Sequence, residues 1–243
     1  NVVDTTKPVI NLSGNSSTTI ESGLIYIDSG ATVSDNYDSG LTYNVDLSVV
    51  DTSTLGTYTL TYSATDSSGN QADPVYRTVE VIDTTLPVIN IIGSSVMNVE
   101  ASQSQFDEPG FTASDSYEGN ITPSVVTSGV VDMQTLGTYI LRYNVSDSSG
   151  NAAVEKTRTV TVDDNTSPLI TIQGNETMNV ELGSTFTDPG VSAFDNLDGD
   201  LTNSIIIEGS VDTFVAGVYT ITYKVVDSQG NVAQQVTRTV IVG

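Results

Sequence analysis

The clearest pattern of apolar and polar positions in this chain is an alternating segment that occurs three times. It reads GTYTLTYSATDSSGN over Gly56–Asn70, GTYILRYNVSDSSGN over Gly137–Asn151 and GVYTITYKVVDSQGN over Gly217–Asn231. Apolar residues recur at every second position through the first part of each copy. A period of two is typical of a β-strand with one face in a core and the other in water. In the first copy the residues predicted to face the core are Tyr58, Leu60, Tyr62 and Ala64.

Each copy ends in Asp-x-x-Gly-Asn. Glycine and asparagine tolerate the positive φ that a tight reversal requires, so we expect a long strand, a tight turn and a returning strand. The Gly-x-Tyr at the start of each copy resembles a tyrosine corner, the crossover that locks a β-sandwich.

The spacing of the copies predicts the domain organisation. Tyr58, Tyr139 and Tyr219 recur at roughly 80 residues, which is too long for a solenoid unit and suits a sandwich domain of roughly 100 residues or fewer. No segment has a helical period. The sequence therefore predicts three all-β sandwich domains, over residues 1–82, 83–163 and 164–243, each with about seven strands.

Composition makes the core of each domain sparse. The chain has five Phe, no Trp and no Cys, and a domain of about 80 residues buries only some 60–65% of its unfolded surface. Disulfides are therefore excluded as a source of stability. The chain shows no signal peptide and no long apolar run that would span a membrane. We expect it to be an excerpt from a longer repetitive protein.

The charge balance excludes some partners and suggests another. Thirty Asp and Glu against seven Lys and Arg give a net charge of −23, whereas nucleic acids and anionic lipids require basic faces. The acidity is explained either by solubility in a saline habitat or by binding of divalent cations.

Four motifs carry a resemblance to a known family. They are the opening phrase Asp-Thr-Thr-x-Pro-Val-Ile, the loop Asp-x-x-Asp-Gly-Asp, the Gly-x-Tyr-x-h-x-Tyr strand (h is apolar) and the Asp-x-x-Gly-Asn turn. Together they resemble bacterial immunoglobulin-like repeats of the hyalin-repeat type, which occur in tandem in bacterial and archaeal surface proteins and beside secreted enzymes. The resemblance implies tandem immunoglobulin-like Greek-key sandwiches. It also implies a non-catalytic extracellular segment on the cell surface: a stalk, an adhesin spacer or a surface-layer piece.

In an immunoglobulin-type sandwich the first strand starts at the end that carries the B–C and F–G loops, so three acidic pieces of each repeat should meet there. Loops of Asp, Asn and backbone carbonyls suit calcium, which takes six to eight oxygen ligands in flexible geometry. Without His or Cys, zinc, copper and iron sites are poorly supplied; magnesium remains an alternative. The predicted calcium ligands are Asp163, Asp164, Asp195, Asp198, Asp200 and Asp227 in the third repeat, Asp83, Asp115, Glu118, Asn120 and Asp147 in the second, and Asp4, Asp35, Asp38 and Asp66 in the first.

The acidic sets differ between repeats. The sixth loop position holds Asp200 in the third repeat, Asn120 in the second and Gly40 in the first. The third repeat also has Asp163 where the others have an apolar residue. We therefore expect calcium affinity to decrease from the third repeat to the second and then to the first. The alternative is that these residues only form turns, because Asp at a strand end and Asp-x-x-Gly-Asn in a hairpin need no metal.

The linker Val162–Pro168, which reads VDDNTSP, is similar to a cadherin linker, in which calcium rigidifies consecutive domains. By this comparison Glu100 and Asp132, or Glu21 and Asp51, would lie at the bottom of the preceding domain and complete a bridging site. The hypothesis is that calcium stiffens the chain at its domain junctions.

Three arginines, Arg77, Arg158 and Arg238, stand in phase with inward-facing residues. We interpret them as structural partners of a strand-end Asp, or as turned outward by a bulge; a ligand-binding cation is the alternative.

Catalysis has little support, because no Ser–His or Cys–His arrangement exists without His or Cys, and small sandwiches predict no large cleft for a carboxylate-based glycosidase. We expect no enzyme. The alternative function is a carbohydrate- or cell-binding accessory module of a secreted hydrolase or adhesin, for which Tyr37 and Tyr117 are the suggestive residues. Expected partners are neighbouring repeats of the same chain and a cell-surface glycan or protein.

Overall fold

The computed structural model describes residues 3–102 and 104–243. The chain divides into two compact units, one of Asn1–Asn90, Thr112–Val125 and Asn144–Val154, the other of Ile91–Phe111, Val126–Tyr143 and Glu155–Gly243. The second sequence repeat therefore contributes segments to both units, and the predicted domain boundaries stay a prediction.

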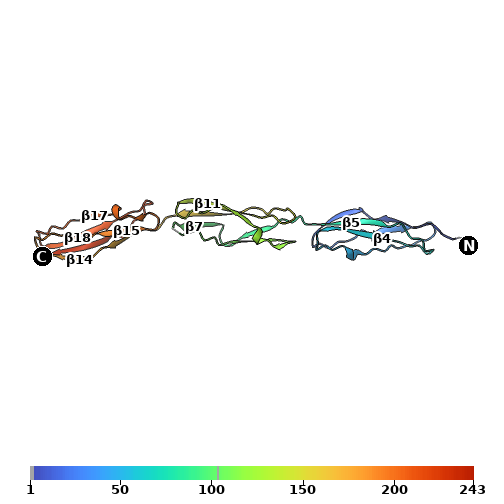
Figure 1. Cartoon of the computed structure of the whole chain (residues 1–243), viewed down its shortest axis with the longest axis horizontal. Helices are drawn as coiled ribbons and strands as arrows, with labels where there is room; N and C mark the ends of the chain where they lie inside the picture. Colours follow the sequence, from blue (N-terminus) through green and yellow to red (C-terminus); the bar gives the residue numbers. More distant parts are fainter. Residues whose placement is uncertain (1–2, 103) are drawn as a thin grey trace. The chain divides into compact units, whose positions relative to one another are not determined.

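The first repeat forms two small sheets from five strands, coloured blue to cyan in Figure 1. One sheet pairs β1 (Val9–Leu12) antiparallel with β3 (Ala31–Ser34). The other places β5 (Val75–Ile82) between β2 (Ser17–Glu21), which runs parallel to it, and β4 (Gly56–Tyr62), which runs antiparallel. The chain thus changes sheet between β1 and β2. The buried core comprises Ile10, Leu60, Tyr62, Ala64, Ala72 and Val79.

The second repeat contains seven strands in two sheets. One sheet has the order β6 (Val88–Ile91), β8 (Phe111–Asp115) and β9 (Gly119–Asn120). The other has the order β10 (Val126–Ser128), β11 (Gly137–Asn144), β12 (Lys156–Asp163) and β7 (Val96–Glu100). As in the first repeat, the strand that follows the sheet change, β7, pairs parallel to the last strand.

The third repeat has the same plan. One sheet consists of β13 (Leu169–Ile172), β15 (Val191–Asp195) and β16 (Gly199–Asp200), and the other has the order β14 (Thr177–Val180), β19 (Val236–Val242), β18 (Gly217–Lys224) and β17 (Ile206–Glu208). Its buried core includes Ile170, Ala193, Ile221, Tyr223, Val225 and Val240.

The all-β prediction is confirmed, with three immunoglobulin-like repeats. Within the described residues, helix is limited to three short 3-10 turns, η1 (Leu47–Val49), η2 (Thr122–Ser124) and η3 (Thr202–Ser204), and no helix is both long and apolar enough to span a bilayer. Over residues 3–82 the first repeat has no counterparts of the short strands β9 and β10. At the position that corresponds to β10 this described part makes an isolated bridge between Asn44 and Ser63.

The tyrosine corner predicted from Gly-x-Tyr is present in all three repeats. The hydroxyl of Tyr58 donates to the carbonyl of Thr54 at 2.8 Å, and Tyr139 and Tyr219 make the same bond to the fourth residue before them. In the Asp-x-x-Gly-Asn turns the positive φ falls on glycine alone, 91° at Gly69. The asparagine therefore has a different role, described below.

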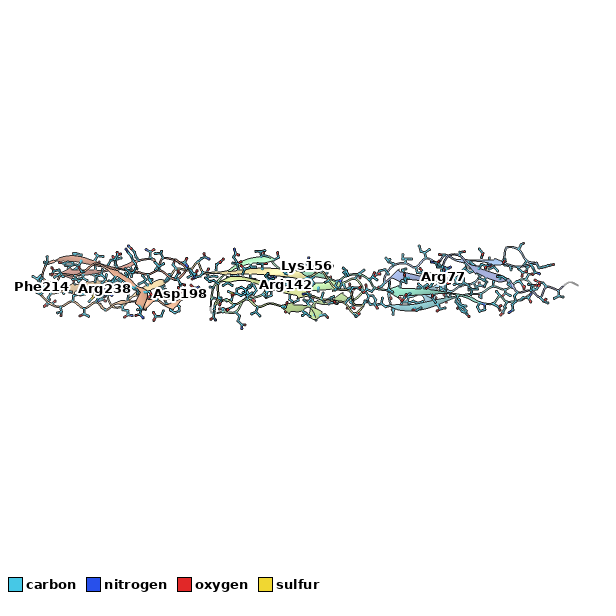
Figure 2. The ribbon with its side chains drawn as sticks, turned by 90° about the horizontal axis from the view of Figure 1, so that it is seen from above. Arg77, Arg142, Lys156, Asp198, Phe214 and Arg238 are labelled. Carbon is cyan, nitrogen blue, oxygen red and sulfur yellow. The ribbon has the colours of Figure 1, made fainter. Side chains whose placement is uncertain are left out.

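Arg77, Arg158 and Arg238 are buried and hold neighbouring segments together through ion pairs and hydrogen bonds. Arg77 and Arg238 lie within the strands of their repeats (Figure 2). Arg238 is fully buried; its Nε lies 3.0 Å from Asp188 Oδ1, and its Nη2 donates to the carbonyls of Gln173 and Gly190 at 2.7 and 2.9 Å. Arg77 pairs in the same way with Asp28, and Arg158 with Glu108. The structural interpretation holds, but each partner acid lies in the turn before β3, β8 or β15 instead of at a strand end, and no bulge turns the arginine outward.

Candidate metal centres

Three groups of aspartates meet at the point where each repeat begins. Each group joins one Asp from the opening linker, one from the end of β3, β8 or β15, and one from the turn after β4, β11 or β18. In each group, carboxylate oxygens of all three residues lie within 4.8 Å of one another. The groups are Asp4, Asp35 and Asp66; Asp83, Asp115 and Asp147; and Asp164, Asp195 and Asp227.

Local turns aim these carboxylates at one another. In the third repeat Asp195 Oδ1 accepts hydrogen bonds from the backbone N–H of Leu197 and Asp198, both at 2.9 Å. Asp227 Oδ1 likewise accepts from the N–H groups of Gln229 and Asn231. One oxygen of each side chain is thus engaged by its own loop, and the other is left to face the group.

The three groups differ in whether the second carboxylate oxygen, Oδ2, of each aspartate accepts a hydrogen bond. In the third repeat the Oδ2 atoms of Asp164, Asp195 and Asp227 are all buried and accept no hydrogen bond from any described residue. Buried carboxylate oxygens without donors are costly unless a cation or proton meets them. The third group is therefore a ready set of three oxygen ligands.

The second repeat satisfies its corresponding oxygens internally. Asp83 Oδ2 accepts from Ser149 Oγ at 3.2 Å, Asp115 Oδ2 from Thr85 Oγ1 at 3.4 Å and Asp147 Oδ2 from Asn151 Nδ2 at 2.9 Å. The first repeat is intermediate: the Oδ2 atoms of Asp4 and Asp35 are unpaired, whereas Asp66 Oδ2 accepts from Asn70 Nδ2.

Electrostatics reflect the crowding in the third group. Burial raises the pKa of Asp164 above its ordinary value, and the neighbouring charges of Asp195 and Asp227 add to the rise. The pKa of Asp227 is lowered in spite of its burial, because Asn231 and the backbone of its turn donate hydrogen bonds to it. Burial and crowding thus disfavour the ionised form of the Asp164 carboxylate, whereas the hydrogen bonds of its turn favour the ionised form of Asp227.

A glutamate from the preceding repeat reaches each of the two later linkers. Glu100 Oε1 accepts from the N–H groups of Asn165 and Thr166 at 2.9 and 3.0 Å, and it also raises the pKa of Asp164. Glu21 accepts from the N–H and hydroxyl of Thr84, both at 2.8 Å. The structure thus places these two glutamates beside the linkers, as the cadherin comparison anticipated. Asp51 and Asp132 instead accept hydrogen bonds within their own turns.

Nine of the fifteen predicted ligands fall in the three groups; the other six have separate surroundings. Asp38, Glu118 and Asp198 each accept from the backbone N–H and hydroxyl of a serine in the facing turn, Ser67, Ser148 and Ser228. Asn120 and Asp200 accept from the N–H of Thr122 and Thr202, in the following 3-10 turns. Asp163 is exposed at the end of β12, where its backbone carbonyl accepts from Ala101.

Sequence reasoning missed the part played by the turn asparagines. Asn231 Nδ2 donates to the backbone carbonyl of Asp164 at 3.2 Å, and Asn70 and Asn151 make the equivalent bonds to Asp4 and Asp83. The asparagine thus ties the turn to the linker. Its recurrence in all three Asp-x-x-Gly-Asn turns is the sequence signal of this role, which turn geometry alone does not require.

The chemistry open to these groups is cation binding by oxygen. Three carboxylates, nearby hydroxyls and backbone carbonyls match the ligands of calcium, and neither nitrogen nor sulfur ligands are present for zinc or copper. Of the two tyrosines considered for sugar binding, Tyr37 is 72% exposed and Tyr117 is half-buried.

The sequence matches the family described as bacterial surface protein, Ig-like domain, over residues 10–81, 89–162 and 170–242. Curated relatives include hyalin from Strongylocentrotus purpuratus, 32% identical over 99% of this chain and 21% of hyalin. Another is the pesticidal crystal protein Cry22Aa from Bacillus thuringiensis, 30% identical over 93% of this chain and 33% of that protein. The chain thus spans a third or less of the length of these relatives.

Two solved structures illustrate the structural matches. The M60 catalytic domain with CBM51 domains of Clostridium perfringens ZmpB matches 76% of this chain and 33% of that chain at 13% identity, with a TM-score of 0.42. The human desmocollin-1 ectodomain matches 98% of this chain and 61% of that chain at 15% identity, with a TM-score of 0.31. At these TM-scores the matches carry no argument about function.

Proposed function

We propose, from the premise that the chain belongs to the bacterial surface protein family of Ig-like domains, that it is a non-catalytic, extracellular spacer whose domain junctions are held by calcium. The observation that carries this proposal is the third aspartate group, in which three buried oxygens without hydrogen-bond donors face one another. The similarity to hyalin supports an extracellular repeat protein.

In the proposed mechanism each aspartate group binds one calcium ion. The ion neutralises three carboxylates that otherwise repel one another, and it joins the opening linker to the two loops at the same end of the repeat. The glutamates Glu21 and Glu100 extend this connection, because each belongs to the preceding repeat and already binds the linker. Calcium would therefore stiffen the chain where one repeat follows another.

The direct test is a calorimetric titration of the full chain with calcium chloride, with magnesium chloride as the competitor. We expect calcium to bind, with the third group as the strongest site. A variant with Asp164, Asp195 and Asp227 all changed to Asn retains the size of each side chain and should lose that site alone. The proposal is contradicted if the purified protein binds no calcium, or if the triple variant binds it as the parent does.

Stiffening is tested separately by small-angle X-ray scattering with calcium and with chelator. Calcium should increase the maximum dimension and narrow the distance distribution. An unchanged distribution would reject the mechanical role while leaving calcium binding intact.

A further inference from the structure

The second repeat contains an open pocket of about 490 Å³, called the cavity below, that lies between core residues and the exposed segment 127–130. Its walls include Phe106, Phe111, Leu141 and Tyr143, and Glu108 lies on its lining. The Phe111 and Tyr143 rings are in contact, with their centroids 5.0 Å apart. A largely apolar cavity of this size with few polar groups has the character of a small-molecule site.

Two polar atoms at this cavity are left without partners. Tyr143 is 1% exposed, and its hydroxyl lies beside Glu108 and Arg158 without a hydrogen bond of good geometry to any residue that the structure describes; burial is the main cause that raises its pKa. Glu108 Oε2 is also buried and unpaired, because Arg158 binds only Oε1, at 2.9 and 3.0 Å. A buried hydroxyl and a buried carboxylate oxygen therefore remain available to a ligand.

The third repeat has a smaller pocket, of about 310 Å³, beside the corresponding residues Phe186, Val211 and Ile221, but in the other two repeats the tyrosine hydroxyl is paired. The hydroxyl of Tyr62 donates to Asp28 at 2.6 Å, and the hydroxyl of Tyr223 donates to Asp188. Leu60 and Ile221, which correspond to Leu141, are 0% and 5% exposed, whereas Leu141 is only half-buried. The second repeat thus differs from its neighbours in both the polar pair and the apolar wall.

Two sequence differences accompany the larger pocket of the second repeat. The acid before the turn glycine is Glu108 in place of Asp28 and Asp188, so its carboxylate stands one methylene farther from the backbone. The segment from Glu100 to Glu108 is also one residue longer than the corresponding segments of the other repeats.

We propose that this cavity of the second repeat binds a small neutral molecule with an apolar ring and a single hydroxyl group. The ring packs against Phe106, Phe111 and Leu141. The hydroxyl of the ligand accepts a hydrogen bond from Tyr143 and donates one to Glu108 Oε2, which satisfies both buried atoms.

The residues around the cavity disfavour charged ligands and sugars. A cationic ligand would lie beside Arg158, and an anionic one would meet Glu108 within a chain of net charge −23. A sugar would bring several hydroxyls to a cavity whose exposed lining is mostly apolar, and each unpaired hydroxyl is costly in an apolar site.

The test is a titration of the ¹⁵N-labelled full chain, followed by NMR, with three probes that share a methylbenzene ring: p-cresol, toluene and p-toluate. We expect p-cresol to shift the amides around Phe111 and Tyr143 and to bind about 100-fold more tightly than toluene, the factor expected of two additional hydrogen bonds. Equal binding of p-cresol and toluene, tighter binding of p-toluate, or shifts outside these residues would overturn the proposal.

Two variants separate the site from the fold. Tyr143→Phe removes one of the two hydrogen bonds, so it should reduce p-cresol affinity about tenfold and leave toluene binding unchanged. Glu108→Asp reproduces the acid of the other repeats, so it should pair with Tyr143, keep Arg158 bound and weaken p-cresol about tenfold. Unchanged amide shifts in the remaining repeats show that each variant is folded. Retention of full p-cresol affinity in both variants would also overturn the proposal.

Discussion

Replacement of Asp195 by Asn is expected to have two opposite effects on the third repeat. It should stabilise the repeat without calcium and weaken the binding of calcium. Asp195 is 2% exposed; its Oδ1 accepts two backbone hydrogen bonds, and its Oδ2 accepts none. An asparagine retains the Oδ1 acceptor and the shape of the loop. It also presents an NH₂ donor to the carboxylates of Asp164 and Asp227, so that repulsion is replaced by hydrogen bonding.

The expected gain without calcium follows from the spacing. At the 4.8 Å limit on the distance between the oxygens, each pair of charges repels by about 0.9 kcal/mol at the dielectric constant of water and by about 3.5 kcal/mol at an effective constant of 20. Asp195→Asn removes two such pairs. The free energy of unfolding of the calcium-free third repeat should therefore rise by about 2 kcal/mol or more at low ionic strength.

In the presence of calcium, the expected change in the free energy of unfolding has the opposite sign. The variant loses a carboxylate ligand, and calcium affinity should fall by at least about tenfold, because even the outer partners of metal ligands change affinity by about 10- to 100-fold. At saturating calcium, a tenfold loss removes about 1.4 kcal/mol of ligand-linked stabilisation.

The assay is denaturant unfolding of the full chain with residue-resolved hydrogen exchange over 164–243, in chelator and in calcium. Asp198→Asn is the matched control, since it makes the same charge change three residues away at a carboxylate bound by Ser228. If both variants respond alike in chelator, or if Asp195→Asn retains the full calcium effect, the reasoning fails.

Three further outcomes follow from particular contacts. Arg238→Met should destabilise the third repeat by about 3 kcal/mol, the lower end for breaking a buried pair, because Arg238 is fully buried but its partner Asp188 is 24% exposed. Lys224→Met removes an exposed pair and should change the free energy of unfolding by about 1 kcal/mol or less; denaturant unfolding measures both. Tyr223→Phe should cost about 1.5–3 kcal/mol through its lost bond to Asp188, while Tyr143→Phe should cost less than 1 kcal/mol because its hydroxyl is unpaired; equal losses in thermal unfolding would contradict this. Because the pKa of Asp164 is raised in the folded state, its ionisation opposes folding at neutral pH, so the calcium-free third repeat should gain stability from this group as the pH falls towards about 4; the gain should be absent in Asp164→Asn and in calcium, as measured by hydrogen exchange.

Much of the fold was predictable because the relevant signals are local. The alternation around Tyr58, the glycine of each turn and the Gly-x-Tyr entry each act through neighbouring backbone, and the structure confirms them. The meeting of Asp164, Asp195 and Asp227 was also predictable, because immunoglobulin-like topology brings those loops to one end.

The features that the sequence did not reveal depend on distances across the core. The pairing of Arg158 with Glu108 joins residues 50 positions apart, and no local pattern distinguishes this acid from an ordinary turn residue. The occupied oxygens of the second group depend on hydroxyls, such as those of Thr85 and Ser149, that reach the carboxylates only in three dimensions. Burial favours the second group over the first as a calcium site, whereas the number of unpaired oxygens favours the first. The order of these two affinities stays a prediction.

The two ends of the first pair of strands, β1 and β3, differ in the contacts that hold them. In the first repeat β1 and β3 run antiparallel, with Val9 opposite Ser34 and Leu12 opposite Ala31. Near the Leu12 end, Arg77 binds the carbonyls of Ser13 and Gly30 and is neutralised by Asp28. At the Val9 end lie Asp4 and Asp35, whose facing oxygens have no donor. One end is therefore held by charges that already match, whereas like charges repel at the other end, where the proposed calcium ion would neutralise them. Removal of calcium should loosen the linker end of this pair and leave the arginine end intact.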